Sequence, residues 1–145
     1  MDGSTQEGEP TINLDDLGFW DDYAGLQMIN TAELGLPAGS VADDAEAMAL
    51  VKMWKLGPLE LPLPATVSPA TIDASIQGVV RRDVLEFYLT QPGTTFHPEL
   101  SSWGADGPLA ARLADGRVVL IDGTHRWAAA HLLGEPWFSV QILGL

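Results

Sequence analysis

The sequence predicts an α/β (α+β) fold, a small mixed sheet packed against helices, preceded by an acidic N-terminal extension. The chain has 145 residues, 46% of them hydrophobic, which is enough for the core of one domain. In the last third, strand-like and helix-like segments follow one another in the order hairpin, helix, strand. Residues 1–50 hold eleven acids and no base. We therefore expect a partly disordered acidic extension over residues 1–40 and a single domain over residues 41–145.

The charge distribution restricts the partners of the protein. Residues 51–145 hold nine acids against seven bases, so the chain lacks the basic stripe that binds nucleic-acid backbones. There is no cysteine, which excludes disulfides and thiolate chemistry. Apolar runs are too short to span a bilayer, and the N-terminus is acidic where a signal peptide would be basic. We expect a cytoplasmic protein that binds neither membranes nor, without specificity, nucleic acids.

The stretch "INLDDLGFWDDYAGLQMINTAEL" interleaves aromatic residues with aspartates. One interpretation is that these apolar groups pack on the core of the protein itself. The other is that they form a docking segment for a basic, grooved partner. The pattern alone leaves both open, and we favour the first.

The clearest helix of the first half is predicted in "SVADDAEAMALVKMWKLGP". Asp43 or Asp44 suits the N-cap, the acids lie at the positive end of the helix dipole, and Gly57 followed by Pro58 ends the helix. Four apolar residues share one face and are expected in the core: Ala47, Leu50, Val51 and Trp54.

Three elements and a loop are predicted between residues 59 and 108. "LELPLPA", residues 59–65, alternates like a short edge strand. "SPATIDASIQG", residues 68–78, indicates a short helix with Ser68 as N-cap and Gly78 as terminator. "VVRRDVLEFYL", residues 79–89, has the apolar spacing of another helix. The rest is expected to be loop, in which Trp103 is the best candidate for a ligand contact.

The last third has the strongest local signals. "PLAARL" and "RVVLI" are predicted to form a hairpin that turns at Asp115-Gly116, because glycine accepts the positive φ of such a turn. Val118 to Ile121 is apolar without alternation, which predicts a strand buried on both faces. A helix over Thr124 to Leu133, closed by Gly134, and a final strand in "WFSVQIL" complete the domain.

The junction of that strand and helix, "DGTHR", has the parts of a phosphate-binding turn. A helix N-terminus attracts anions because its first amide hydrogens have no partners within the helix. Gly123 permits close approach of a ligand, Thr124 can cap the helix or donate to phosphate, and Arg126 offers a fork of donors. His125 can act as donor, acid or base near neutral pH. The same residues also suit a plain N-cap.

The stretch "LIDGTHRWAAAHLLGEPWFSVQIL", which follows a hairpin and has "IDASIQG" upstream, resembles the core motif of the ParB/sulfiredoxin superfamily. The resemblance covers residues 109–143 and, more thinly, residues 59–78. It implies a small α/β domain whose turn binds nucleotide phosphates. Members hydrolyse CTP, reduce sulfinic acids with ATP, phosphorylate serine or act as nucleases. By resemblance, phosphate would be contacted by Gly123, Thr124, His125 and Arg126, with Asp122 nearby.

The resemblance also limits the chemistry. Sulfiredoxins carry their catalytic cysteine where Thr124 stands, so this chain cannot be a sulfiredoxin. Kinase members imply a carboxylate that activates the acceptor, for which Glu60 is the first candidate and Asp73 the second. The candidate catalytic residues are thus Glu60, Asp122 and His125, and the implied cofactor is a nucleoside triphosphate with Mg²⁺. The three histidines are too scattered for a metal motif. A second cationic contact would have to come from Arg81, Arg82, Arg112 or Arg117.

Two functions of different classes remain open. The first is a nucleotide-binding ParB/sulfiredoxin-like domain that binds alone or also acts as a Mg²⁺-dependent NTPase or phosphotransferase. The second is a non-catalytic accessory protein of plasmid or phage type. It would bind a basic or nucleic-acid-binding protein through the acidic N-terminal region, which would imitate nucleic acid.

Overall fold

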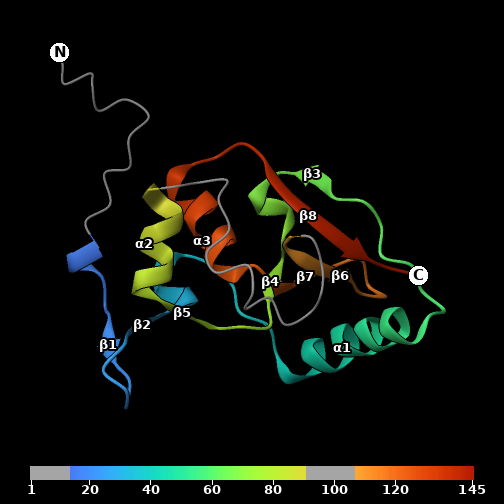
Figure 1. The fold of residues 1–145 in the computed structure, drawn as a ribbon, viewed down its shortest axis with the longest axis horizontal. Helices are drawn as coiled ribbons and strands as arrows, with labels where there is room; N and C mark the ends of the chain where they lie inside the picture. Colours follow the sequence, from blue (N-terminus) through green and yellow to red (C-terminus); the bar gives the residue numbers. More distant parts are fainter. Residues whose placement is uncertain (1–13, 91–106) are drawn as a thin grey trace.

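The computed structural model describes residues 14–90 and 107–145, which form three α-helices and two β-sheets (Figure 1). The larger sheet has the strand order β3-β8-β6-β7-β4. The β8–β6 and β7–β4 pairs are parallel and the other pairs are antiparallel, so the mixed α+β class predicted from the sequence is confirmed. The bounds of these strands, in sheet order, are Ala65–Val67, Phe138–Leu143, Leu109–Arg112, Val118–Asp122 and Ala74–Ser75.

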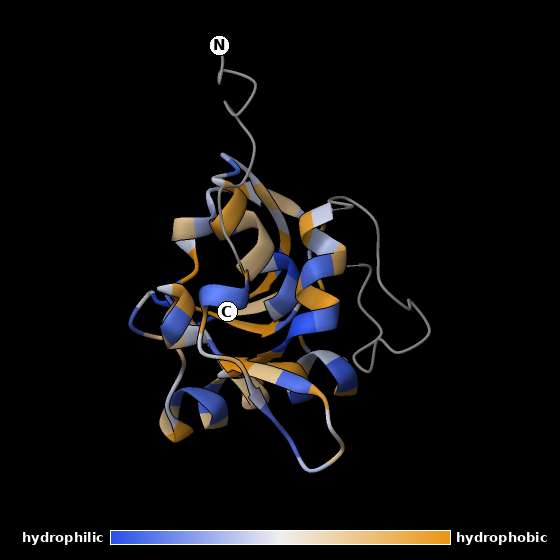
Figure 2. Ribbon diagram, turned by 90° about the vertical axis from the view of Figure 1, so that its left-hand side faces the viewer, coloured by the Kyte–Doolittle hydropathy of each residue, from blue (hydrophilic) through white to orange (hydrophobic). Residues whose placement is uncertain are grey.

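Helices cover both faces of the larger sheet. Helix α1 (Val41–Leu56) packs on one face, and α2 (Arg82–Thr90) and α3 (Thr124–Leu133) lie over the other (Figure 1). Strand β7, an interior strand of this sheet, contributes to the core on both faces: Val119 and Ile121 lie on the α1 side, and Val118 and Leu120 lie on the α3 side. The prediction that this strand is buried on both faces is confirmed. Figure 2 shows hydrophobic residues on the strands in the middle of the molecule and also on the helices around them.

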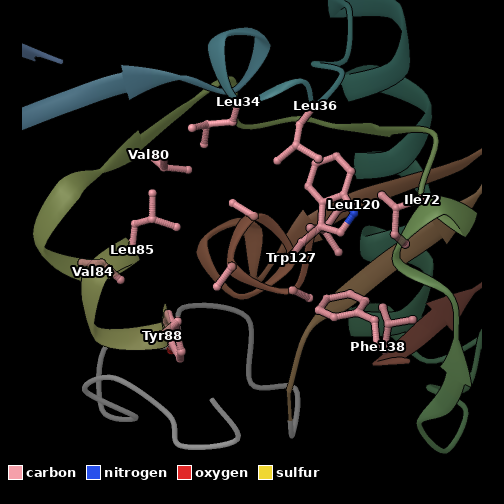
Figure 3. Packing of buried hydrophobic residues seen from close by; sticks show 14 of the residues in the cluster. Leu34, Leu36, Ile72, Val80, Val84, Leu85, Tyr88, Leu120, Trp127 and Phe138 are labelled. Atoms are coloured by element: carbon pink, nitrogen blue, oxygen red, sulfur yellow. The ribbon is translucent and has the colours of Figure 1, made fainter. Parts of the chain in front are cut away.

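Helix α3 lies in the middle of the larger core cluster. Trp127 is only 1% exposed, and its Nε1 donates a hydrogen bond of 3.0 Å to the carbonyl oxygen of Pro69. Leu36 of the N-terminal segment lies beside the Trp127 ring, while Leu85 of α2 lies on the other side of α3 (Figure 3). The buried alanines that follow Trp127 keep the helix narrow, so the sheet and α2 can pack closely against it.

The N-terminal segment contributes a second sheet with the order β1-β2-β5. Its strands are β1 (Trp20–Asp21), β2 (Gln27–Asn30) and β5 (Val79–Arg81), all antiparallel. Two short 3₁₀ helices, η2 (Leu14–Asp16) and η3 (Thr31–Leu34), flank the β1–β2 hairpin. Ile29 and Leu34 are buried, so part of the expected extension supplies strands and core residues. Residues 1–13 lie outside the described part of the chain.

The prediction that Asp43 or Asp44 is the N-cap of α1 is wrong, because the helix begins about one turn earlier. Ser40 is the N-cap, and its hydroxyl accepts a hydrogen bond from the amide of Asp43. The Asp43 carboxylate accepts in return from the amide of Ser40, which completes a capping box. Gly57, at φ 110°, ends the helix as predicted.

The strand predicted over residues 59–65 is wrong, because β3 begins only at Ala65. Pro62 and Pro64 have no amide hydrogen to give to a ladder. The carbonyl oxygen of Pro62 instead accepts from the side chain of Gln141 at 2.8 Å. Antiparallel pairing with β8 starts where the prolines end, at Ala65 opposite Val140.

The helix predicted over residues 68–78 is confined to one 3₁₀ turn, η4 (Pro69–Thr71). Ser68 caps it as expected, since its hydroxyl accepts from the amide of Ala70. The chain then extends into β4, which pairs with β7 in parallel. The prediction fails because the backbone of this segment finds its hydrogen bonds on a distant strand rather than within itself.

The helix predicted over residues 79–89 starts only at Arg82, because residues 79–81 form β5 and pair with β2. The predictions for the last third are confirmed. Strands β6 and β7 form the hairpin around Gly116, at φ 93°, and α3 spans Thr124–Leu133 with Gly134 at its C-terminus. The final strand is β8. Among the described residues, no helix is long and apolar enough to cross a membrane.

Candidate functional site

Gly123 is the N-cap of α3 and is required by both backbone and packing. Its φ of 96° lies in the left-handed region that favours glycine. A Cβ at this position would lie 2.8 Å from the Cβ of Pro108, which precedes the neighbouring strand β6. The sequence suggested that Gly123 lets a ligand approach the backbone closely. On this side of Gly123, the group that lies close to the backbone is Pro108.

Thr124 turns its side chain into the protein. It is 1% exposed, and its hydroxyl oxygen lies 2.8 Å from that of Ser75 in β4. The Ser75 hydroxyl also accepts from the amide of Gln77 at 3.2 Å. The two hydroxyls thus join the start of α3 to β4. The Thr124 side chain takes its hydrogen bond inside the protein rather than from outside.

His125 joins α3 to β5. Its Nε2 accepts a hydrogen bond of 2.9 Å from the backbone amide of Arg81. Burial lowers the pKa of His125 to about 4, and the charge of Arg81 acts in the same direction. The imidazole is therefore neutral at pH 7 and carries its proton on Nδ1. Because the Nε2 lone pair is occupied, this nitrogen is not available as a general base.

Asp122 and Arg126 bring opposite charges to the same turn. The carboxylate of Asp122 accepts from the amide of Gly123 at 2.9 Å. Burial raises the pKa of Asp122, while the Gly123 amide and the charge of Arg126 act in the opposite direction. The guanidinium carbon of Arg126 lies 5.7 Å from the centre of the Tyr88 ring, within the range of a cation–π contact.

A cavity of about 330 Å³, open to solvent, runs along one side of α3. Arg126 stands at the end of the cavity nearest the helix N-terminus. Residues Ala129, Ala130 and Leu133 continue the same helical stripe. The cavity is also lined by Tyr88, Gly107 and Pro108, by residues of β8, and by Glu135 and the exposed Trp137. The lining therefore combines one cation, Arg126, and one acid, Glu135, with a mainly apolar surface.

The helix adds positive potential near Arg126. Gly123 has no side chain that could cap α3, and the amide of Trp127 is the first to bond back into the helix, to the carbonyl oxygen of Gly123. The first amides of a helix point along its axis and carry the positive end of its dipole. Arg126 is in this first turn, whereas Gly123, Thr124 and His125 do not line the cavity. An anion held by Arg126 would therefore lie near the positive end of the dipole without direct contact to those three residues.

The two upstream carboxylates do not join this turn. Glu60 is exposed and lines a different cavity, of about 640 Å³, between α1 and the ends of β6 and β8. Asp73 accepts a hydrogen bond of 2.9 Å from the amide of Val118, and its own amide donates to the Val118 carbonyl oxygen. Asp73 therefore fixes the start of the β4–β7 pair.

The four arginines considered for a second cationic contact are placed elsewhere or are paired. Arg112 lines the same cavity as Glu60. The other three are in ion pairs: Arg81 with Asp83, Arg82 with Asp15 and Glu86, and Arg117 with Asp43 and Asp115. Arg81 does touch the turn, but it does so with its backbone amide, which donates to His125, while its guanidinium is held by Asp83.

The structure adds groups that sequence reasoning missed. Ser75 lies in the "IDASIQG" stretch, and Tyr88 lies in the segment with the apolar spacing of a helix. No local signal points to either role, because both depend on α3 packing against distant segments. Trp103 lies outside the described residues. In residues 14–90 and 107–145, no three histidine or acidic side chains gather into a group that could hold a metal ion. Comparisons with family models, curated proteins and solved structures found no match.

Proposed function

We propose that the protein binds a nucleoside phosphate in the cavity beside α3 and does not convert it to a product. The observation that supports this proposal is that Arg126, in the first turn of α3, lines one cavity together with a mainly apolar stripe of the same helix. Phosphate would lie at the Arg126 end, and the base and sugar would lie along Ala129, Ala130 and Leu133 toward Trp137. A volume of about 330 Å³ is within the range of small-molecule sites.

The arrangement favours binding over catalysis. Phosphoryl transfer requires a carboxylate or water-positioning group beside the transferred phosphate. Glu60 faces another cavity, Asp73 is bonded to a strand end, and the Nε2 of His125 accepts from Arg81. Asp122 is the carboxylate at the turn, but it is not among the residues that line the cavity. It would help to hold a Mg²⁺ ion that the phosphates bring with them only where that ion extends past Arg126 toward the turn. Of the phosphate contacts that the ParB/sulfiredoxin resemblance implies for residues 123–126, this proposal keeps that of Arg126, because Thr124 and His125 form their hydrogen bonds within the protein.

Calorimetric titration of the full chain with ATP, CTP, GTP and ADP, with and without Mg²⁺, tests the proposal. We expect one nucleotide to bind with a micromolar Kd. Arg126→Ala is expected to weaken binding by at least about thirtyfold, the effect of losing a charge-assisted contact worth about 2 kcal/mol. Arg112→Ala is the matched control, because it removes an arginine from the other cavity, and should bind like wild type.

Two results would overturn the proposal. One is the absence of heat with every nucleotide. The other is an equal affinity in wild type and Arg126→Ala, with circular dichroism showing that both are folded. Release of phosphate from the bound nucleotide, abolished by Arg126→Ala, would keep the site but refute binding without turnover.

A further inference from the structure

The turn of the β1–β2 hairpin is closed by several hydrogen bonds. The Oδ1 of Asp22 accepts from the amides of Ala24 and Leu26, both at 2.9 Å. The backbone closes the turn again, since the amide of Asp22 donates to the carbonyl oxygen of Leu26. Gly25 supplies the positive φ, 82°, that the turn needs. The backbone of this turn is therefore fixed by hydrogen bonds.

The structure sorts the apolar residues of the N-terminal segment into two sets. Leu14, Leu17 and Phe19 are partly buried and pack against the main core cluster. Tyr23 at the turn is fully exposed, and Trp20 and Leu26 beside it are 44% and 37% exposed. The prediction that this segment packs on its own core is therefore confirmed for the first set and wrong for the second. In Figure 1 the hairpin extends away from the main sheet.

The hairpin is negatively charged. Asp21 lies in β1 and Asp16 in η2, and neither forms an ion pair within the part of the chain that the structure describes. Asp15 does pair, with Arg82. No base occurs before Lys52 in the sequence. Arg81 in β5 interacts electrostatically with Asp22 and offsets part of the charge of the hairpin. A partner that covers Trp20, Tyr23 and Leu26 would still meet the negative charges of Asp16 and Asp21.

From these observations we infer that the hairpin is a docking surface for a basic protein, one with an apolar pocket rimmed by lysine or arginine. Exposed aromatic residues on a rigid turn are typical anchors of protein interfaces, because they bury a large area and lose little conformational freedom. The aspartates complement a basic rim and speed encounter. Nucleic acid does not fit, since it carries the same sign of charge, and a second copy of the hairpin would be repelled for the same reason.

Selection of a phage-displayed library of random 16-residue peptides against the full chain tests this inference. We expect the enriched peptides to carry net positive charge and apolar residues. Synthetic versions should bind at least about tenfold more weakly to Tyr23→Ala and to Trp20→Ala. Binding should also weaken as salt rises from about 0.05 to 0.5 M, because exposed charges are screened. The control Leu63→Ala, at an 87% exposed leucine of another segment, should bind like wild type.

Each outcome of this experiment either supports or overturns the inference. Because Tyr23 has almost no contacts to lose, Tyr23→Ala should unfold at the wild-type temperature, so weaker binding cannot be attributed to a damaged fold. Failure to enrich any peptide, enrichment of neutral or acidic peptides, or equal affinity in Tyr23→Ala and wild type would overturn the inference. A concentration-dependent dimer that Tyr23→Ala dissolves would also overturn it, because the occupant would then be a second copy. Nucleotide titration does not involve the hairpin, so the two proposals fail separately.

Discussion

Replacing Gly123 by alanine tests how the candidate turn is built. Two costs add at this position. A non-glycine residue at a φ of 96° is strained by roughly 1–2 kcal/mol. The new Cβ would also lie 2.8 Å from the Cβ of buried Pro108, a contact that only a backbone shift can relieve. Overpacking of this kind costs about 1–3 kcal/mol. The smaller entropy of the unfolded alanine chain offsets less than about 1 kcal/mol.

Gly116→Ala is the matched control for this prediction. Gly116 has nearly the same φ, 93°, but an added Cβ would have nothing within 4 Å. The control should therefore lose only the conformational part, about 1 kcal/mol after the entropy offset. We expect Gly123→Ala to lose about 2–4 kcal/mol in total.

Urea unfolding, followed by tryptophan fluorescence and by circular dichroism, measures both losses. The quantity that decides is the difference between the two variants, because their backbone strain nearly cancels. Equal losses for Gly123→Ala and Gly116→Ala would refute the packing of Pro108 against the turn. A loss in Gly116→Ala as large as that expected for Gly123→Ala would refute the assumed cost of the positive φ.

Three further predictions concern the buried histidine, the hydroxyl pair and the helix cap. The folded pKa of His125, about 4, lies below its ordinary value of 6.5, so the unfolded chain binds more protons between these values. The contribution of His125 to stability, up to about 3 kcal/mol, should be present above pH 6.5 and lost as pH falls toward 4. In His125→Gln, the free energy of unfolding measured in urea should change less with pH over that range. Thr124→Val and Ser75→Ala should each cost about 1–2 kcal/mol and couple in a double-mutant cycle; additive losses would contradict their hydrogen bond. Ser40→Ala should cost about 1 kcal/mol in thermal unfolding by removing the capping box, and an unchanged melting temperature would show that α1 does not depend on it.

Elements with local start and stop signals could be predicted nearly to the residue. Helix α3 begins after Gly123 and ends before Gly134, and the β6–β7 hairpin turns at Asp115-Gly116. In each case the deciding physics acts over a few residues, through positive φ and capping of helix ends. Residues 68–81 had comparable local signals for helix. Within this stretch, residues 74–75 and 79–81 form strands because their partners, β7 and β2, offer hydrogen bonds and burial from far along the chain.

In the candidate site, too, the sequence shows which residues are present but not where their side chains point. That an acid, a glycine, a histidine and an arginine meet at a helix start is readable from "DGTHR". That Thr124 turns to Ser75, 49 positions away, and His125 to Arg81, 44 positions away, is not. The cavity beside Arg126 likewise needs Tyr88 and β8 to be brought to the side of α3.

The sequence by itself determined the excess of acid in the first third, the mixed class of the fold and the bounds of its last elements, because composition and local backbone preferences need no partner. The tertiary structure alone decided which of the aromatic residues between Leu14 and Asn30 face the core and which face solvent. It also decided which polar groups of the DGTHR turn form hydrogen bonds inside the protein. The physical reason is that burial and hydrogen bonding are settled by whichever distant segment packs nearby, and packing exists only once the chain has folded.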